Sequence, residues 1–407
     1  MHLLAPILLS LASVAFGLED KPDLIVLKTG KEIECRVMRE SETSVFYKSG
    51  RKVKELELDK VEGVHSIERS MRLFLERYSE LDSRNVVALT ELALWAENEA
   101  LAGEARNLWI RILLLDNENE QAWTKLGGSH SKRGWRLRVR GRYYNLEDLR
   151  GRVGEWKNAL ELPTAHFLVK TNIDPLRALD VSIDVERLYM MYYDLIGKPM
   201  ELYPFEQVPE LHIYGDADDA PRPPQPHWTA WFERIGNAVL VRGQEAQPHE
   251  VRKAVIDLML TNSFRMALGN NQGALPQWAR EGIGNAFAIA MRPEAGNLGV
   301  ETGVPYLPWF ESHAADEKPV SLKKVLDAGR GAFNTGGDES RFVAQSYTLV
   351  FFLLRGAEGK YRETFIAYLR SAFDGKGAAS HFKKIFDLKL EDLDQEWSAF
   401  VKQTAGA

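Results

Sequence analysis

The spacing of apolar residues predicts that the ordered part of the chain begins with short β-strands. Between residues 23 and 67, apolar and polar positions alternate, as where Ile33, Cys35 and Val37 are separated by Glu34 and Arg36. Such alternation is typical of strands that bury one face. Turns that contain glycine divide the segment into four or five runs. We therefore expect a small, curled antiparallel sheet over residues 18–68.

A helical pattern replaces this alternation between residues 69 and 130. Ala105, Trp109 and Leu113 recur at intervals of four, which places them on one face of a helix. The run over residues 88–128 resembles a tetratricopeptide repeat, with Gly103-x-Ala105 between its two helices. About one and a half repeats are visible, whereas a solenoid needs roughly three to bury its faces. A helical hairpin packed on its neighbours is therefore expected here.

A basic segment separates these helices from a large mixed region. Residues 131–144 read SKRGWRLRVRGRYY, in which apolar residues alternate with arginines and predict an exposed hairpin. A patch for an anionic polymer is the alternative interpretation of this hairpin. A linker helix completes the region to residue 161. Strands and helices then alternate to about residue 242, and helices dominate after residue 290.

These patterns together predict an α+β, multidomain protein. The N-terminal sheet resembles the small Sm-like or SH3-like barrels that occur in exported bacterial proteins, so a small β-barrel is expected there. The helical hairpin and the basic segment follow it. The mixed domain is predicted over residues 162–405, and its C-terminal part is expected to be mostly helical.

An apolar run precedes the first predicted strand. Residues 1–17 read MHLLAPILLSLASVAFG, with small residues at positions 15 and 17. This pattern is typical of a secretory signal peptide, so we expect export to the periplasm or the extracellular space. A signal-anchored form is the alternative, although about 15 apolar residues are fewer than the roughly 20 that span a bilayer. We expect no transmembrane segment after the signal is removed.

Composition and charge narrow the classes of function. The chain is 45% hydrophobic and 27% charged, as is usual for a globular protein. Its formal net charge of −6 gives no electrostatic case for nucleic-acid binding. Cys35 is the one cysteine, which excludes a disulfide within the chain. Because it lies in an alternating strand, we expect a buried side chain rather than a nucleophile.

The residues that suggest chemistry lie between positions 248 and 287. Zinc peptidases of the two-helix kind carry His-Glu-x-x-His, in which the histidines lie one turn apart and bind the metal. The glutamate between them polarises the metal-bound water. His249 and Glu250 match the first half of this motif. The later segment LPQWAREGIGNAF contains Trp-x-x-Glu-Gly, and its Glu281 stands where the second helix of such enzymes supplies a third ligand.

The position of the second histidine holds Lys253 instead. A lysine ammonium has three donors and no lone pair, so it does not bind zinc while it is protonated. His249 is the only histidine between Trp228 and Ser312, and no shift of register restores the motif. We therefore predict no metal or other cofactor. His249 and Glu281 are interpreted as vestigial ligand positions, and Glu250 as a vestigial general-base position.

The order of these segments resembles the peptidase MA-like gluzincins. More narrowly, it is similar to a bacterial family of domains of unknown function that often follows tetratricopeptide-like helices and a small barrel. The resemblance covers roughly residues 162–403, and LPQWAREGIGNAF is its most specific piece. It implies that His249 matches the first zinc ligand, Glu250 the general base and Glu281 the third ligand. Lys253 departs from the second ligand, and Val343 stands where such families often carry a tyrosine.

Three hypotheses for function follow from this combination. The first is an exported pseudo-metallopeptidase, a binding or scaffolding module of the cell envelope. Its protein or peptide partner would add a strand in a groove between an edge strand, Ala238–Val241, and the His-Glu helix. The second is an active zinc metallopeptidase with an atypical second ligand, such as Asp257 or a distant histidine. The third is partner binding by the N-terminal barrel and helices alone.

Without a metal, the carboxylate of Glu281 needs another positive partner. A half-buried carboxylate that lacks one carries a large desolvation cost. Lys253 stands at the helix position that faces this glutamate in the related zinc fold, so we predict an ion pair between them. Asp257, one turn further along the same helix, is a competing partner in the weaker i,i+4 order. A solvent-exposed Lys253 is the remaining alternative.

The apolar N-terminal run makes a prediction about processing. We expect the mature chain from the native host to begin near Leu18, because the small residues before it match a signal-peptidase site. N-terminal sequencing of that protein checks this expectation. An intact Met1 in a cytoplasmic fraction would contradict both the cleavage and the export.

Overall fold

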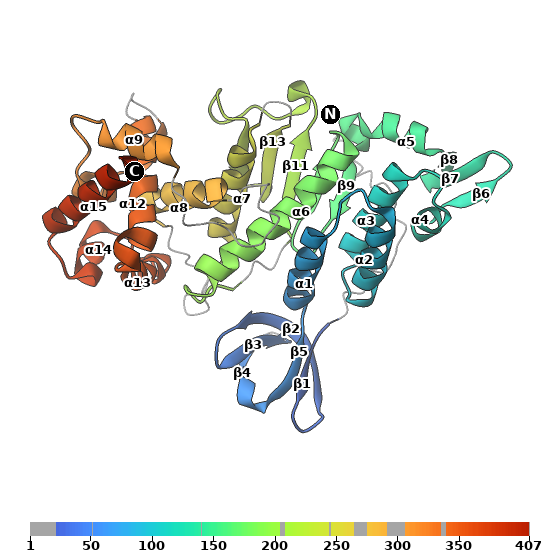
Figure 1. The fold of residues 1–407 in the computed structure, drawn as a ribbon, viewed down its shortest axis with the longest axis horizontal. Helices are drawn as coiled ribbons and strands as arrows, with labels where there is room; N and C mark the ends of the chain where they lie inside the picture. The colour runs from blue at the N-terminus through green and yellow to red at the C-terminus, as the bar shows by residue number, and fades with distance from the viewer. Residues whose placement is uncertain are drawn as a thin grey trace, which may run out of the picture. The chain divides into compact units, whose positions relative to one another are not determined.

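The computed structural model describes residues 22–50, 52–139, 141–203, 208–243, 246–263, 275–290, 306–334 and 339–406. The predicted signal peptide, residues 1–17, lies outside them. The chain divides into two compact units, each assembled from segments that are distant in sequence. The first unit comprises residues 1–190, 207–247 and 296–298, and the second comprises residues 191–206, 248–295 and 299–407. Helices and sheets both contribute to the chain (Figure 1), which confirms the predicted α+β class.

The first unit opens with a five-stranded antiparallel sheet in the order β4-β3-β2-β1-β5. Its strands are β1 (Asp23–Leu27), β2 (Glu32–Glu40), β3 (Ser44–Ser49), β4 (Lys52–Glu57) and β5 (Val61–His65). Cys35 is only 8% exposed and packs in a cluster with Ile25, Val45 and Tyr47. Burial raises the pKa of its thiol to about 11. The predicted strands and the buried cysteine are confirmed.

Four helices follow this sheet in the first unit. They are α1 (Ile67–Glu80), α2 (Val86–Asn98), α3 (Ala102–Leu115) and α4 (Glu120–Lys125). A side chain caps the N-terminus of three of them: Ser66 caps α1, Asn85 caps α2 and Asn119 caps α4. The predicted helical face of α3 is buried, since Trp109 and Leu113 are each 2% exposed. The helical pattern read from the sequence is therefore confirmed.

The basic segment forms a three-stranded sheet and a short helix. The elements are β6 (Ser129–Ser131), β7 (Gly134–Val139), β8 (Arg142–Tyr144) and α5 (Leu146–Val153). Trp135 of β7 stacks on Trp123 of α4, with ring centroids 6.0 Å apart. Arg138 of the same strand is exposed. The predicted strands and the helix after them are confirmed; β6 and most of β8 are exposed, whereas most of β7 is half-buried.

A second five-stranded sheet, in the order β12-β13-β11-β10-β9, completes the first unit. Its strands are β9 (Leu160–Pro163), β10 (Leu168–Thr171), β11 (Glu210–Tyr214), β12 (Ala230–Glu233) and β13 (Ala238–Arg242). The central strands β10, β11 and β13 are parallel, and the two edge strands are antiparallel to their neighbours. Parallel strands need a crossover connection. Helix α6 (Pro175–Tyr192) supplies it between β10 and β11, and lies along one face of the sheet (Figure 1).

This topology corrects the prediction that Ala238–Val241 is an edge strand. The strand, now β13, is covered on its outer side by β12, whose Trp231 pairs with Leu240. Prolines are dense in the segment just before β12, and this loop-like composition hides the strand in the sequence. Because both sides of β13 are paired with other strands, it offers no free edge for a peptide.

The second unit is helical in its described residues. After a π-helical turn at Tyr193–Gly197, its helices are α7 (Pro248–Asn262), α8 (Gln277–Ala290), α9 (Leu307–Ala314), α10 (Leu322–Leu326), α11 (Arg330–Asn334), α12 (Glu339–Arg355), α13 (Arg362–Phe373), α14 (Ala379–Phe386) and α15 (Leu390–Ala405). The predicted C-terminal helices are confirmed, whereas the sequence did not predict α9 and α11. Within the described residues of the whole chain, no helix is both long and apolar enough to cross a bilayer.

Helix α8 packs closely against α12 at Gly282. A Cβ atom at position 282 would lie 2.4 Å from the carbonyl oxygen of Ser346 and 2.4 Å from the Cγ2 atom of Val350. Both distances are far shorter than a van der Waals contact, so only glycine fits here. The packing of α8 on α12 therefore depends on the missing side chain. At Gly284, by contrast, the nearest atom would be Lys253 Cγ at 3.4 Å, which is an ordinary contact.

This difference in the space around Gly282 and Gly284 predicts that alanine at the two positions changes the free energy of unfolding differently. Gly282→Ala is expected to lower the free energy of unfolding by about 1–3 kcal/mol, because backbone atoms of α12 must move. Gly284→Ala is the matched control: it lies on the same helix and is expected to be neutral or stabilising, since alanine favours helix by about 1 kcal/mol. Denaturant unfolding of both variants measures the contrast. Equal stability of the two variants would contradict the close approach at Gly282.

Candidate functional site

The His-Glu pair lies in the first turn of α7. Pro248 begins the helix, where its missing N–H has no consequence for helical hydrogen bonds. His249 is exposed, and Glu250 lies in the same turn, where a negative charge interacts favourably with the helix dipole. The opposite face of α7 is apolar, and Val255 and Leu258 are each 1% exposed. This apolar face packs α7 into its unit without help from a metal.

Lys253 forms the predicted ion pair with Glu281. Its Nζ atom lies 3.0 Å from Glu281 Oε2, and the competing Asp257 carboxylate is further away, at 3.7 Å. The side chain of Lys253 is 29% exposed and that of Glu281 is 12% exposed, so both are largely removed from water. The prediction of an α7–α8 ion pair is therefore confirmed, and the alternative of a solvent-exposed Lys253 is wrong.

Two further contacts complete a charge cluster, which we define as Lys253, Asp257, Arg280 and Glu281. Arg280 Nε lies 2.9 Å from Asp257 Oδ1, and the Nη2 atom of Arg280 donates to the Asp257 carbonyl oxygen at 2.9 Å. Gln277 Nε2 donates to Glu281 Oε1, also at 2.9 Å. Burial alone would lower the pKa of Lys253, but the charges of Asp257 and Glu281 raise it above its ordinary value. The lysine therefore stays a cation.

The residues of this site do not fit a catalytic zinc ion. Such an ion takes three protein ligands besides water, whereas here a protonated lysine lies against the third-ligand carboxylate. Asp257, the alternative second ligand, is bound by Arg280. Val343, at the position where the resemblance to gluzincins implies a tyrosine, is half-buried in α12. In the described part of the chain, no three His, Cys, Asp or Glu side chains converge in a metal-binding group.

Packing accounts for the other residues of the Trp-x-x-Glu-Gly segment. Trp278 is fully buried and stacks on Tyr368 of α13, with ring centroids 6.0 Å apart. It also meets Phe382 of α14 edge to face, at 5.8 Å. Gly282 allows α8 to approach α12, as described above. The tryptophan and the glycine thus have structural roles that do not require catalysis.

The comparisons with known proteins do not assign this chain to a family. No model of a protein family matches the chain, and no curated protein matches it. The resemblance to gluzincins therefore depends on the residues of the α7–α8 segment and on the order of the elements.

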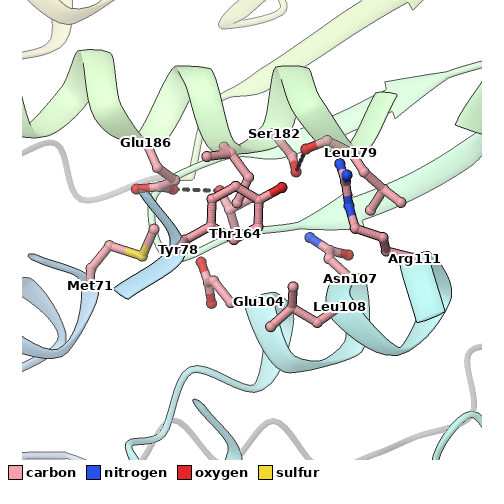
Figure 2. Close-up of a pocket in the computed structure, with 11 residues that line it drawn as sticks. Met71, Tyr78, Glu104, Asn107, Leu108, Arg111, Thr164, Leu179, Ser182 and Glu186 are labelled. Atoms are coloured by element: carbon pink, nitrogen blue, oxygen red, sulfur yellow. Dashed lines mark hydrogen bonds between the residues drawn. The ribbon is translucent and has the colours of Figure 1, made fainter. Parts of the chain in front are cut away.

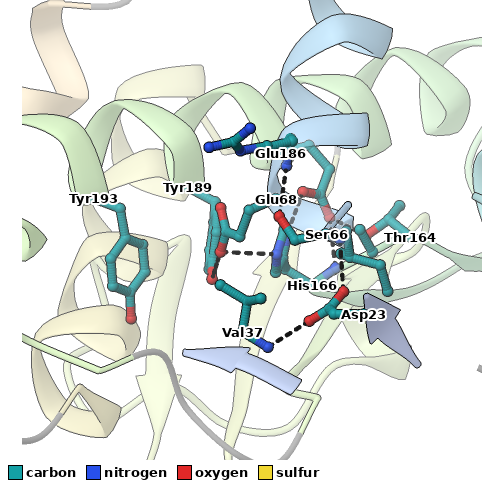
Figure 3. A network of polar contacts seen from close by, with 12 residues as sticks. Asp23, Val37, Ser66, Glu68, Thr164, His166, Glu186, Tyr189 and Tyr193 are labelled. Carbon is teal, nitrogen blue, oxygen red and sulfur yellow. Dashed lines mark hydrogen bonds and ion pairs between the residues drawn. The ribbon is translucent and has the colours of Figure 1, made fainter. Parts of the chain in front are cut away.

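The sequence reading missed a polar cluster in the first unit, centred on His166 (Figure 3). The Nδ1 atom of His166 lies 2.7 Å from Glu186 Oε2, and its Nε2 atom lies 3.5 Å from Glu68 Oε1. Its backbone N–H and the hydroxyl of Thr164 both donate to Glu186 Oε1. Tyr189 donates to Glu68 at 2.9 Å, and its ring stacks on that of His166. The imidazolium thus lies between two carboxylates from α1 and α6.

Glu104 brings a third carboxylate into the same region from α3. Its Oε1 atom accepts a hydrogen bond from the N–H of Ala165 at 2.6 Å. Beside it lies a cavity of about 10 Å³, lined in part by Glu104, Asn107 and Glu186 (Figure 2). A cavity of that size has room for one water molecule. The cluster therefore ties α1, α3, α6 and the β9–β10 connection together.

The ionisation of these groups follows from their neighbours. Burial by itself lowers the pKa of His166, but Glu186 and Glu68 raise it to about 10. Burial would raise the pKa of Glu68, yet the hydrogen bond and charge of His166 lower it. For Glu104, burial and the charge of Glu186 together raise the pKa to about 7. At neutral pH, His166 is therefore a buried cation.

One sequence feature could have revealed this cluster. On the buried face of α6, apolar residues such as Leu179 and Ile183 recur at helical spacing, and Glu186 occupies the next position of that face. A glutamate in such a position requires a buried partner. The partner, His166, lies 20 residues earlier in the sequence, and no local pattern predicts that separation.

The ion pair across α7 and α8 leads to a prediction for stability. Lys253→Met is expected to lower the free energy of unfolding by about 1–3 kcal/mol, because Glu281 is left largely buried without its cation. Adding Glu281→Gln should restore part of the loss, which a double-mutant cycle measures. Lys198→Met is the control, since Lys198 pairs with Asp194 in the same unit but is 48% exposed. That change should cost about 0.5 kcal/mol or less; an equal loss in both variants would contradict the coupling.

The His166 cluster predicts a loss of stability at alkaline pH. Because the pKa of His166 is higher in the folded chain than the roughly 6.5 of an unfolded histidine, its stabilisation is complete below about pH 6.5 and is lost as the pH rises through about 10. We expect the difference in unfolding free energy between the wild type and His166→Gln to shrink over this window. Denaturant titrations from neutral to alkaline pH measure it. A difference that is constant with pH would show that the imidazole is not charged.

Proposed function

We propose that this chain is a non-catalytic, peptidase-like protein that serves as a binding or scaffolding module. We also propose that the protein is exported, and that it carries a small N-terminal barrel and tetratricopeptide-like helices. Its proposed partner is a protein or peptide of the cell envelope. The single observation that supports it is the Lys253–Glu281 ion pair at 3.0 Å. A fixed ammonium takes the place where a gluzincin would need the charge of its metal.

The charge cluster can stabilise the contact between α7 and α8, but it contains no Lewis acid. A zinc ion polarises water and stabilises a developing oxyanion because it is a Lewis acid with an open position. The Lys253 ammonium offers only N–H donors, and it lies within ion-pair distance of Glu281 and Asp257. It neutralises the carboxylates that would otherwise destabilise the α7–α8 contact, but it does not generate a nucleophile. The cluster therefore preserves the fold of this region and leaves hydrolysis without a catalyst.

The mode of partner binding follows from the corrected sheet topology. Strand addition at β13 is excluded as the basis of the proposal, because β12 covers that strand. The edge strands of this sheet are β9 and β12. Arg106 and Asn107 of α3 donate to the carbonyl oxygens of Glu161 and Pro163 on β9, so that edge is already covered. A peptide partner that adds a strand would therefore use the edge of β12.

The proposal predicts the metal content of the protein and of one variant. The wild type should hold far less than one zinc ion per chain after dialysis against trace zinc, whereas Lys253→His should acquire zinc, because a second imidazole then faces Glu281. Lys253→Met is the control for loss of the ammonium alone. Elemental analysis and a competition titration with a zinc dye give the readout. A tightly held zinc ion in the wild type, lost in His249→Ala, would overturn the proposal in favour of an active metallopeptidase.

A further inference from the structure

The basic segment forms a charged surface distinct from the charge cluster and from the edge of β12. Strands β6, β7 and β8 lie side by side as a small antiparallel sheet (Figure 1). In the sequence, residues 131–144 carry six lysine and arginine residues and no acidic residue, although the whole chain has a net charge of −6. The sheet is thus a positively charged region of a protein that is otherwise negative.

One face of this sheet is covered by the neighbouring helices. Trp135 of β7 stacks on Trp123 of α4. The Arg152 guanidinium of α5 lies over the ring of Tyr144 on β8, 4.8 Å from its centroid. Val139, on the same side of β7 as Trp135, is 7% exposed. Because successive side chains of a strand point to opposite faces, the residues between these positions lie on the other face of the sheet.

The other face, which we call the cationic face, presents Arg136, Arg138 and Tyr143. Arg138 is exposed and is paired across the two strands with Tyr143, whose side chain is 54% exposed. Arg136 is half-buried two residues earlier on β7. Lys132 and Arg133, both exposed, form the turn between β6 and β7 and extend the positive charge beyond the strands.

The charges of this region are not balanced within the described part of the chain. There, no residue forms an ion pair or a hydrogen bond with the side chains of its four cations, Lys132, Arg133, Arg136 and Arg138. By contrast, Arg152 on the covered side donates to the side chain of Asn158. Complementary charges steer and select the partners of a protein surface. The cationic face is therefore suited to an acidic partner.

The composition of the cationic face argues against two kinds of acidic partner. An anionic membrane favours surfaces whose apolar side chains enter the lipid boundary, whereas Tyr143 is the one large apolar side chain that this face exposes among its described residues. A single-stranded nucleic acid favours a series of aromatic rings for stacking, but Trp135 and Tyr144 are on the covered side. A long polyanion would also meet the negative remainder of the chain.

An extended acidic peptide matches the spacing of the arginines. Arg136 and Arg138 are two residues apart on one strand, which corresponds to about 7 Å. Alternate side chains of an extended peptide point to the same side and recur at the same distance. A guanidinium also matches a carboxylate with two parallel hydrogen bonds. Acidic residues at alternate positions of a peptide can therefore pair with both arginines at once.

From this arrangement we propose that the cationic face binds an extended peptide segment in which Asp or Glu alternates with other residues. The carboxylates of this segment accept hydrogen bonds from Arg136 and Arg138. The partner is the protein or peptide of the proposed function, on which this inference rests, and its chemistry is that of an acidic strand. Because the cationic face contains no residue of the charge cluster, zinc uptake and peptide binding can each fail without the other.

A labelled peptide of sequence Glu-Thr-Glu-Thr-Glu-Thr-Glu tests the proposal by fluorescence anisotropy with the full chain. Binding is expected at low ionic strength, and it should weaken as salt screens the charges. Arg138→Glu should weaken binding about tenfold, because a repulsion replaces an attraction. Arg84→Glu is the matched control: Arg84 is exposed in the same unit, so the net charge changes equally, and binding should be unchanged.

The melting temperature of each variant separates loss of binding from loss of structure. Because Arg138 and Arg84 are both exposed, neither substitution should change it. If Arg138→Glu unfolds the sheet, Arg138→Gln keeps the test decisive, since it removes the charge without a repulsion and should weaken binding about threefold. Absence of binding by the wild type, or equal affinity of the wild type and both Arg138 variants, would overturn the proposal.

Further probes test the class of partner. A peptide of the same composition with its glutamates consecutive should bind more weakly, because only half of them then point to one side of the extended chain. A single-stranded thymidine oligonucleotide and vesicles that contain phosphatidylglycerol present phosphates instead of carboxylates. Tighter binding of the alternating peptide than of all three supports an acidic strand. Equal binding of the two peptides, or tighter binding of the oligonucleotide or the vesicles, would contradict it.

Discussion

The second unit depends on how closely α8 approaches its neighbours. At Gly282 the helix leaves no space for even one methyl group against α12. This approach fixes the rotation of α8 about its own axis. As a result, Trp278 enters the aromatic core and Glu281 faces α7. The steric constraint at Gly282 and the ion pair at Glu281 therefore belong to the same helix orientation.

Once Glu281 is held against α7, its charge must be balanced. The positive charges come from Lys253 and Arg280, which also lie against the second carboxylate, Asp257, rather than from an ion taken up from solution. In the first unit, the positive charge of His166 similarly balances the negative charges of Glu186 and Glu68. In both places a protein cation joins two helices: the consecutive helices α7 and α8 in the second unit, and the distant helices α1 and α6 in the first. Breaking such a pair is costly because the remaining charge stays buried.

Local patterns predicted most of the elements but only part of the sites. Strands with alternating residues and long amphipathic helices were found because their periodicity is contained within each segment, as with Ala105, Trp109 and Leu113. The strand Ala230–Glu233 was missed because prolines and glycines precede it closely. The Lys253–Glu281 pair was predictable, since one known helix geometry relates the two positions. The contacts of His166 depend on tertiary packing, which a single sequence does not encode in its spacing.

The buried position of Cys35 has a practical consequence. The thiol is the only one in the chain, it is 8% exposed in the core of the N-terminal sheet, and its raised pKa keeps it protonated at neutral pH. Alkylating reagents react with the thiolate, so they reach this sulfur chiefly when the sheet opens. The rate of alkylation therefore reports the opening of one sheet, without a label or an introduced residue. The natural sequence thus contains its own probe for the local stability of that sheet.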